Sequence, residues 1–339
     1  MAPRDSGILQ GEKTDSQGAG KLGALLMSCS KILIIGSGIT GLSCAGKLAD
    51  AGLNVMVLDK GRGVGGRLAT KRTRCGRQFD HGAQYVTARA PNFHAVLRSM
   101  RAAATVDVWE AGAPEPHFVG VPGMSGLPKH LVTGLDVSQN TTVETVGARD
   151  GGWTVTTQTD SLAASHVVVT TPAPQITPLI GVDHPLTRRL LSVEMAPCLT
   201  LMAAFKDGQP IPFTSKRMPQ QPLSWIAYNS SKPSRLSQGC WVAQASVDWS
   251  VENLERDNAE LAELMLPMLC AQIGADPSAA QYVAAHRWRY ARSTSPLGEP
   301  FLRDNSRTLY LGGDWCIGPR VEAGWISGRA IADDILKRI

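Results

Sequence analysis

Residues 31–41 read KILIIGSGITG, an apolar run that leads directly into a glycine-rich turn. The apolar run is typical of a buried β-strand, and the turn has the G-x-G-x-x-G spacing that precedes a helix in dinucleotide-binding folds. In such a turn Gly36 permits the tight bend, Gly38 lets the backbone approach a pyrophosphate, and Gly41 lets the helix pack closely on the strand. Free N–H groups at the helix N-terminus then bind the phosphates. The stretch therefore predicts a dinucleotide site.

The residues that follow extend this pattern to a strand-turn-helix-strand unit. A helix is expected over 39–51 and a second strand over 54–58, which delivers Asp59 at its end. Asp59 comes 59 − 36 = 23 positions after the first glycine, where a carboxylate can accept both hydrogen bonds of a ribose diol and would disfavour the extra phosphate of NADP. Gly65-Gly66-Arg67 follows at once and indicates FAD.

The composition excludes several classes of function. The chain has 339 residues, 43% of them hydrophobic, and a length that suggests two domains. Its net charge is +5, but the basic residues are dispersed, so no nucleic-acid partner is expected. The 7 cysteines include no C-x-x-C pair, which predicts neither a disulfide framework nor a metal site and fits a reducing cytoplasm. No apolar run approaches the roughly 20 residues of a membrane-spanning helix.

The beginning of the chain differs from the rest in composition. Residues 1–28 are rich in Gly, Ser, Lys and Asp and have no sustained period, so they are predicted to be a disordered extension. Alternatively, Met27 is the biological start and the preceding residues are an upstream extension.

The order of the expected elements indicates a nucleotide-binding domain that is interrupted by a second domain. The second domain has its own strands and one strong helix, predicted over 251–273. The predicted boundaries give the FAD-binding domain residues 29–90, 121–182 and 301–339, and the substrate domain residues 91–120 and 183–300. The fold class is therefore α/β, with a Rossmann-type FAD-binding domain and an inserted mixed-sheet α+β substrate domain.

Three separated elements converge on one long cofactor: the glycine turn, the Gly-Gly-Arg loop and a strand that ends in Gly313-Asp314 before a helix expected over 323–338. Arg67 can pair with pyrophosphate oxygens through its planar guanidinium. Asp314 can hold a ribityl or pyrophosphate-side hydroxyl group. The positive end of the last helix can face the flavin pyrimidine.

These motifs resemble those of the renalase-like flavoproteins, a branch of the amine-oxidase superfamily, from about residue 30 to the end. Further segments that carry the resemblance are Gly82-Ala83-Gln84-Tyr85, Pro122-Gly123-Met124-Ser125, Pro172-Ala173-Pro174, His286-Arg287-Trp288-Arg289-Tyr290 and Gly312-Gly313-Asp314-Trp315. The resemblance implies noncovalent FAD and the two-domain architecture of the amine oxidases. Thr40, Arg67, Gln84 and Tyr85 are implied among the FAD contacts. The full set of candidate cofactor-binding residues is Gly36, Gly38, Ile39, Thr40, Gly41, Asp59, Lys60, Gly66, Arg67, Gly82, Ala83, Gln84, Tyr85, Val143, Gly313, Asp314, Glu322, Ala323 and Gly324.

The residue before the last helix bears on the substrate. In the amine oxidases an aromatic residue at this place forms half of a cage for a neutral amine, and the alignment puts Arg320 there. A fixed cation would disfavour ammonium and favour an electron-rich or anionic ligand. Alternatively, Arg320 pairs with Glu322 or with solvent.

The renalase resemblance implies a dihydropyridine substrate, namely isomers of NAD(P)H reduced at ring position 2 or 6. A hydride passes to the flavin, the ring becomes aromatic, and O2 reoxidises the flavin to give hydrogen peroxide. Two alternatives stay open: oxidation of a small amine, and a flavin-binding protein without turnover.

Catalysis of such a reaction needs positioning more than acid–base chemistry, and no catalytic residue is assigned. The substrate-orienting candidates are Arg320 and residues of a strand on which His286, Trp288 and Tyr290 alternate onto one face, with Arg287 and Arg289 on the other. Alternatively, the aromatic face is ordinary core and the arginines are exposed.

Overall fold

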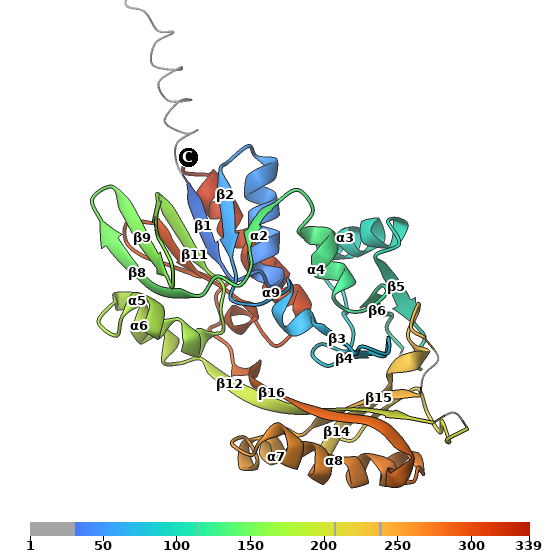
Figure 1. The fold of residues 1–339 in the computed structure, drawn as a ribbon. Coiled ribbons are helices and arrows are strands. Elements are labelled where there is room, and N and C mark those ends of the chain that lie inside the picture. The colour runs from blue at the N-terminus through green and yellow to red at the C-terminus, as the bar shows by residue number, and fades with distance from the viewer. Residues whose placement is uncertain (1–30, 113, 207, 237–238) are drawn as a thin grey trace, which may run out of the picture.

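The computed structural model describes residues 31–112, 114–206, 208–236 and 239–339. The predicted disordered extension over 1–28 lies outside these residues. Among the described residues, two larger sheets lie at opposite ends of the molecule, and smaller elements lie between them (Figure 1).

The first sheet is built around the strand predicted from the opening motif. It has six strands in the order β17-β18-β11-β1-β2-β7, and every neighbouring pair is parallel except β17 with β18. Their bounds are β1 Ile32–Ile35, β2 Val55–Leu58, β7 Asp136–Ser138, β11 His166–Val169, β17 Leu302–Arg303 and β18 Leu309–Leu311. Because β11 and β18 flank β1 on one side, segments far apart in the sequence complete one nucleotide-binding sheet.

Two helices cover one face of this sheet and pack against each other, α2 (Ile39–Asp50) and α9 (Val321–Leu336). Their contact depends on glycine, since a Cβ at Gly328 would lie 2.1 Å from the carbonyl oxygen of Thr40. The other face packs on the antiparallel sheet of β8 (Val143–Arg149), β9 (Gly152–Thr157) and β10 (Ser161–Ala164), together with α5 (Thr177–Ile180) and α6 (Pro185–Leu190).

The second large sheet is antiparallel, in the order β13-β14-β15-β12-β16. Its strands are β12 Glu194–Phe205, β13 Ser215–Arg217, β14 Leu223–Tyr228, β15 Cys240–Ala245 and β16 Ala280–Ser295. Apolar side chains of one face pack under α7 (Val247–Glu252) and α8 (Asn258–Ile273), on the side away from the nucleotide sheet (Figure 1). The opposite face is thereby left toward the nucleotide-binding part.

The prediction of one continuous helix over 251–273 is wrong. The first helix ends at Glu252, and the second begins after Asp257, whose carboxylate accepts hydrogen bonds from the backbone N–H groups of Ala259 at 2.7 Å and Glu260 at 2.8 Å. This cap satisfies N–H groups that a continuous helix would have bonded internally, so the chain starts a new helix here.

The remaining elements lie between the two large sheets. They are β3 Thr70–Arg72, β4 Gln78–Asp80, α3 Pro91–Ala102, β5 Val106–Trp109, β6 His117–Gly120 and α4 Gly126–Leu131. Their core includes Phe93, Leu97 and Trp325 of α9. The fold class predicted from the sequence is confirmed, whereas the domain boundaries stay predictions.

Candidate flavin site and adjoining cavity

The glycine turn forms an anion-binding helix terminus. Helix α2 begins after Gly38 without a side-chain cap, and a Cβ at Gly38 would have open space around it. A Cβ at Gly41, in contrast, would lie 1.9 Å from the carbonyl oxygen of Gly36, so only glycine permits this close turn. The N-terminal N–H groups of α2 are therefore presented beside space for a phosphate.

Asp59 is fixed at the end of β2. Its carboxylate accepts hydrogen bonds from the Ser37 N–H at 2.6 Å, the Ser37 hydroxyl at 2.7 Å and the Gly61 N–H at 2.6 Å. Lys60 beside it is exposed, and Val143 packs in the core with Leu58. These hydrogen bonds hold the Asp59 carboxylate in a fixed position beside the glycine turn, which is the position expected of a ribose-binding acid.

The Gly-Gly-Arg loop meets the C-terminal motif directly. Arg67 donates two hydrogen bonds to Asp314, at 2.9 and 2.6 Å, and a third to the carbonyl oxygen of Ala291 at 2.9 Å. The Arg67 carbonyl oxygen accepts from Ala83 at 2.8 Å, and a Cβ at Gly82 would lie 2.0 Å from that oxygen. The predicted arginine, aspartate and small-residue segment are therefore in contact.

The N-terminus of α9 completes the arrangement. Glu322, 1% exposed, accepts hydrogen bonds from the N–H groups of Arg89 at 2.7 Å and Ala90 at 2.6 Å. A Cβ at Gly324 would lie 2.7 Å from Ile39 Cγ2, so the two helix N-termini approach closely. Neither helix has a side-chain cap. Two uncapped helix termini and a glycine-lined backbone present N–H groups that suit the phosphates of FAD, and Arg67 lies beside them in its pair with Asp314.

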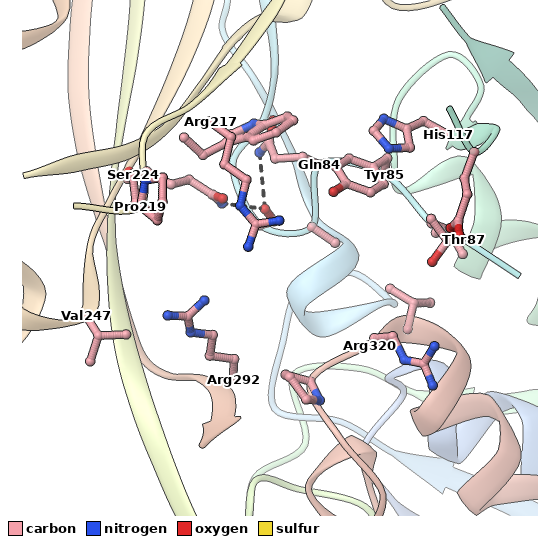
Figure 2. A pocket seen from close by; sticks show the side chains of 18 of the residues that line it. Gln84, Tyr85, Thr87, His117, Arg217, Pro219, Ser224, Val247, Arg292 and Arg320 are labelled. Carbon is pink, nitrogen blue, oxygen red and sulfur yellow. Dashed lines mark hydrogen bonds between the residues drawn. The ribbon is translucent and has the colours of Figure 1, made fainter. Parts of the chain in front are cut away.

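A cavity of about 960 Å³ adjoins this arrangement (Figure 2). One wall is the segment Gly82–Thr87, and another is Pro319–Val321 at the start of α9. The floor is the open face of the antiparallel sheet, where Ser224, Trp225 and Gln244 lie on neighbouring strands. The cavity therefore lies between the nucleotide-binding elements and the second sheet.

Cations outnumber acids in the lining of this cavity. The charged lining residues are Arg89, Arg217, Arg292, Arg320, Glu115 and Asp248. Arg320 lies 3.5 Å from Glu322, which confirms the contact that the sequence left as an alternative, yet its side chain is still 37% exposed. The cavity thus carries a net positive charge.

Aromatic rings extend along the cavity from His117 and Tyr85 to Trp225, which is the cross-strand neighbour of Arg217. Tyr85 and His117 stack with ring centroids 3.6 Å apart and planes at 9°, and Trp225 lies 5.6 Å from Tyr85. Burial lowers the pKa of His117, so the stacked imidazole is held neutral. Aromatic side chains therefore lie in the cavity lining together with the cationic groups.

Of the predicted substrate-orienting residues, Arg320 alone belongs to the described cavity lining. His286 and Trp288 instead form an aromatic cluster with His81, at centroid distances of 4.8 and 5.3 Å. Arg289 forms a bidentate ion pair with Glu255 at 2.7 and 2.9 Å on the other side of the strand. Tyr290 is half-buried outside the described lining.

Sequence reasoning missed Arg217 and Arg292. Arg292 follows Trp288 and Tyr290 at every second position of β16, so the alternation that predicted those two residues on one face could also have predicted Arg292 there. Arg217 lies in a three-residue strand, and nothing in its local sequence indicates its role.

A buried ionic cluster holds Gln84, the predicted FAD contact. Asp80 accepts from Arg235 at 2.6 Å and from Lys232 at 3.2 Å, and Lys232 also donates to the Gln84 side chain at 3.3 Å. Burial opposes the charge of Asp80, but the two cations outweigh it and hold its pKa well below its usual range. Burial lowers the pKa of Lys232 to about 8. These contacts fix Gln84 from the side of the second sheet.

Known sequences match most of the chain. The profile of a family described as flavin containing amine oxidoreductase matches residues 99–336, and that of an NAD(P)-binding Rossmann-like domain matches residues 34–100. The L-glutamate oxidase precursor of Streptomyces diastatochromogenes is 41% identical over 86 residues, which are 24% of this chain and 13% of that protein. The flavin-containing amine oxidase B of Homo sapiens is 39% identical over 67 residues, 20% of this chain and 12% of that protein. The chain therefore spans a small part of the length of these relatives.

Solved structures share the fold over nearly the whole chain. A protein of Exiguobacterium sp. 255-15, described as a protoporphyrinogen oxidase, superposes with a TM-score of 0.75 at 14% identity and covers 92% of this chain and 100% of its own. Putrescine oxidase with bound putrescine gives a TM-score of 0.66 at 15% identity and covers 91% of this chain and 99% of its own. At these identities the likeness concerns the fold.

Two further findings concern the described parts of the chain. No helix there combines the length and apolar character needed to cross a membrane. No group of three His, Cys, Asp or Glu side chains there is arranged to hold a metal ion.

Proposed function

The chain belongs to the flavin containing amine oxidoreductase family, and within this family we propose that it is an oxidase of a dihydropyridine ring. FAD is its cofactor. The proposed substrates are isomers of NAD(P)H reduced at ring position 2 or 6, and the proposed products are NAD(P)+ and hydrogen peroxide. The main support for this proposal is the net positive charge of the cavity lining.

The cavity charge discriminates between the two classes of hydride donor. Four arginines and two carboxylates line it, and the sequence alignment predicts that Arg320 replaces the aromatic residue of the amine cage. A cationic amine such as putrescine would be repelled, whereas a dinucleotide brings negative charge. Tyr85 and Trp225 supply aromatic side chains in the cavity lining against which a pyridine ring could pack.

In this proposal the side chains and backbone of the protein bind FAD and orient the substrate. The α2 terminus, Arg67 and Asp314 would hold the dinucleotide part of FAD, and the Gly82–Tyr85 backbone would lie against its ring. The chemistry that FAD supplies is acceptance of a hydride and transfer of two electrons to O2. Loss of hydride makes the substrate ring aromatic, so no side chain has to remove a proton. Gln84 is held in place by Lys232, which keeps this wall of the cavity rigid.

Oxidation of an amine-bearing acid is the second candidate. The matched segment of L-glutamate oxidase supports it, because the arginines of the cavity could bind carboxylates as well as phosphates. A flavin-binding protein without turnover is the third, and steady-state peroxide formation separates it from both oxidases.

The decisive experiment is an anaerobic half-reaction of the FAD-loaded protein in a stopped-flow instrument. We expect 2- or 6-dihydro NAD(P) isomers to bleach the flavin much faster than ordinary NADH does. Addition of air should then restore the oxidised spectrum and release peroxide. Bleaching no faster than with NADH would overturn the proposal, and rapid bleaching by L-glutamate or by an amine panel would establish the second candidate.

A further inference from the structure

Two arginines enter the cavity from the opposite edges of the antiparallel sheet. Arg217 lies on β13, the first strand in the sheet order, and Arg292 lies on β16, the last. Figure 2 shows both side chains directed into the cavity, whereas Arg320 lies at its other end near Thr87 and His117. Ser224, Trp225 and Gln244 belong to two of the strands between them, so the floor there combines polar groups with one aromatic ring.

Arg217 and Arg292 have no side-chain partner in the described part of the chain, whereas a neighbouring cation on each of the same strands has one. Lys216, next to Arg217, donates to Gln272 at 3.0 Å, and Arg289 pairs with Glu255. Neither Arg217 nor Arg292 has a side-chain hydrogen bond or ion pair with any described residue. The two cations that face the helices therefore have side-chain partners, and those that face the cavity are available to a ligand.

The cavity provides little internal compensation for this charge. Its carboxylates are Glu115, before β6, and Asp248, in the first turn of α7. Neither forms an ion pair with Arg217 or Arg292. Gln244 uses its amide to donate to the Gly82 carbonyl oxygen at 2.7 Å, so it braces the wall instead of shielding a guanidinium.

We infer that this end of the cavity is a phosphate subsite, in which Arg217 and Arg292 bind the phosphate groups of a nucleotide substrate. The inference rests on the proposed function, because it places the pyridine ring toward Tyr85 and Arg320 and the phosphates toward the sheet edges. Guanidinium groups form paired hydrogen bonds with phosphate oxygens, and a diphosphate offers enough oxygens for two separate arginines. A neutral or cationic amine would leave both guanidinium groups without a counter-charge.

The first test measures binding without turnover. ADP and inorganic pyrophosphate are titrated into the FAD-saturated oxidised protein, and binding is followed by calorimetry and by perturbation of the flavin spectrum. Arg217→Gln and Arg292→Gln should each weaken ADP binding about tenfold or more, since each removes a charged hydrogen-bonding partner. Raising the salt concentration should also weaken the binding of ADP to the unsubstituted protein, because salt screens the attraction between phosphate and guanidinium groups.

Matched controls lie on the same strands. Lys216→Gln and Arg289→Gln remove the same charge from the face turned to the helices, and both should leave ADP binding unchanged. Equal losses in the controls, or no loss in Arg217→Gln and Arg292→Gln, would overturn the subsite. Arginine-dependent binding of L-glutamate without binding of ADP or pyrophosphate would also overturn it, because the anion would then be a carboxylate.

The second test separates this inference from the proposed function. The KM for a 6-dihydro nicotinamide dinucleotide should rise in Arg217→Gln and Arg292→Gln, while kcat and the kinetics with the phosphate-free riboside stay unchanged. If no dihydropyridine is oxidised but ADP still binds through both arginines, the proposed function fails and the subsite stands. If the dinucleotide is oxidised with the same KM in all variants, the subsite fails and the function stands.

Discussion

Arg67 and Asp314 form a two-point ion pair, with guanidinium-to-carboxylate distances of 2.9 and 2.6 Å, across 247 positions of sequence. The pair joins the loop after β2 to the start of the C-terminal helical segment. Both residues also stand where a pyrophosphate and a ribityl chain would be expected. The pair therefore fastens the fold, and we propose that the same two side chains also contact the cofactor.

Substitution at this pair should weaken FAD retention. Arg67→Lys cannot keep both hydrogen bonds to Asp314, because an ammonium lacks the planar fork. We expect FAD to dissociate about tenfold or more readily, measured by the rise of flavin fluorescence on dilution. Arg303→Lys is the matched control, since Arg303 also pairs with a carboxylate, that of Asp334, near the C-terminal end of α9. Equal loss of FAD in both variants would assign the effect to general destabilisation.

The glycines between α2 and α9 allow a paired test on the helices themselves. Gly328→Ala would place a Cβ 2.1 Å from the Thr40 carbonyl oxygen and should lower the free energy of unfolding by about 3 kcal/mol. Gly46→Ala, in α2, meets no atom within 4 Å and should raise it by about 0.5–1 kcal/mol. Urea unfolding measures both. A mild effect at Gly328 would mean that the helices can separate at small cost.

Glu322 should contribute to stability through its charge. It is buried and accepts two backbone hydrogen bonds, from Arg89 and Ala90. Glu322→Gln keeps the shape but weakens charge-assisted bonds, and we expect a loss of about 1.5–3 kcal/mol in urea unfolding. Glu263→Gln, on the exposed side of α8, should change stability by less than about 0.5 kcal/mol. Unchanged stability of Glu322→Gln would contradict this role.

The stability of the protein should fall in mild acid because of His81. Burial, with the neighbouring His286 and Lys71, lowers the pKa of His81 to about 4. Between pH 6.5 and 4 the unfolded chain then binds more protons at this residue than the folded chain, so the free energy of unfolding decreases as the pH falls. The expected contribution is about 3 kcal/mol.

The measurement is urea unfolding at a series of pH values for the parent protein and for His81→Gln. The variant should show a shallower loss of stability between pH 6.5 and 4 because it lacks the titrating group. Parallel pH profiles for the two proteins would show that another group causes the acid sensitivity.

The sequence predicted the nucleotide-binding part well because its signals are local. The turn from Gly36 to Gly41 specifies its own strand and helix, and Asp59 follows at a spacing that the strand length dictates. The break before α8 was also encoded, since Asp257 with Glu260 is the pattern of a helix N-terminus, but the apolar periodicity on both sides concealed it.

The cavity could not be predicted in the same way. Arg217 and Arg292 line the cavity because β13 and β16 are the two edge strands of the antiparallel sheet, with three strands between them. The local sequence does not reveal this strand order. Alternation along β16 correctly separated Trp288 from Arg289, but it could not say that His81 covers Trp288. Which part of a strand face remains open depends on elements distant in sequence.

The position of α9 has a consequence for how the protein is made. The nucleotide-binding sheet begins with β1 at Ile32, yet β18 and α9 complete it only after Leu336 has been added. On the ribosome, the N-terminal part therefore waits with an open sheet edge and an uncovered α2 while the intervening sheet is synthesised. We therefore expect cofactor capture to be a late event in biogenesis, and we expect a chain released before α9 to fail to hold its flavin.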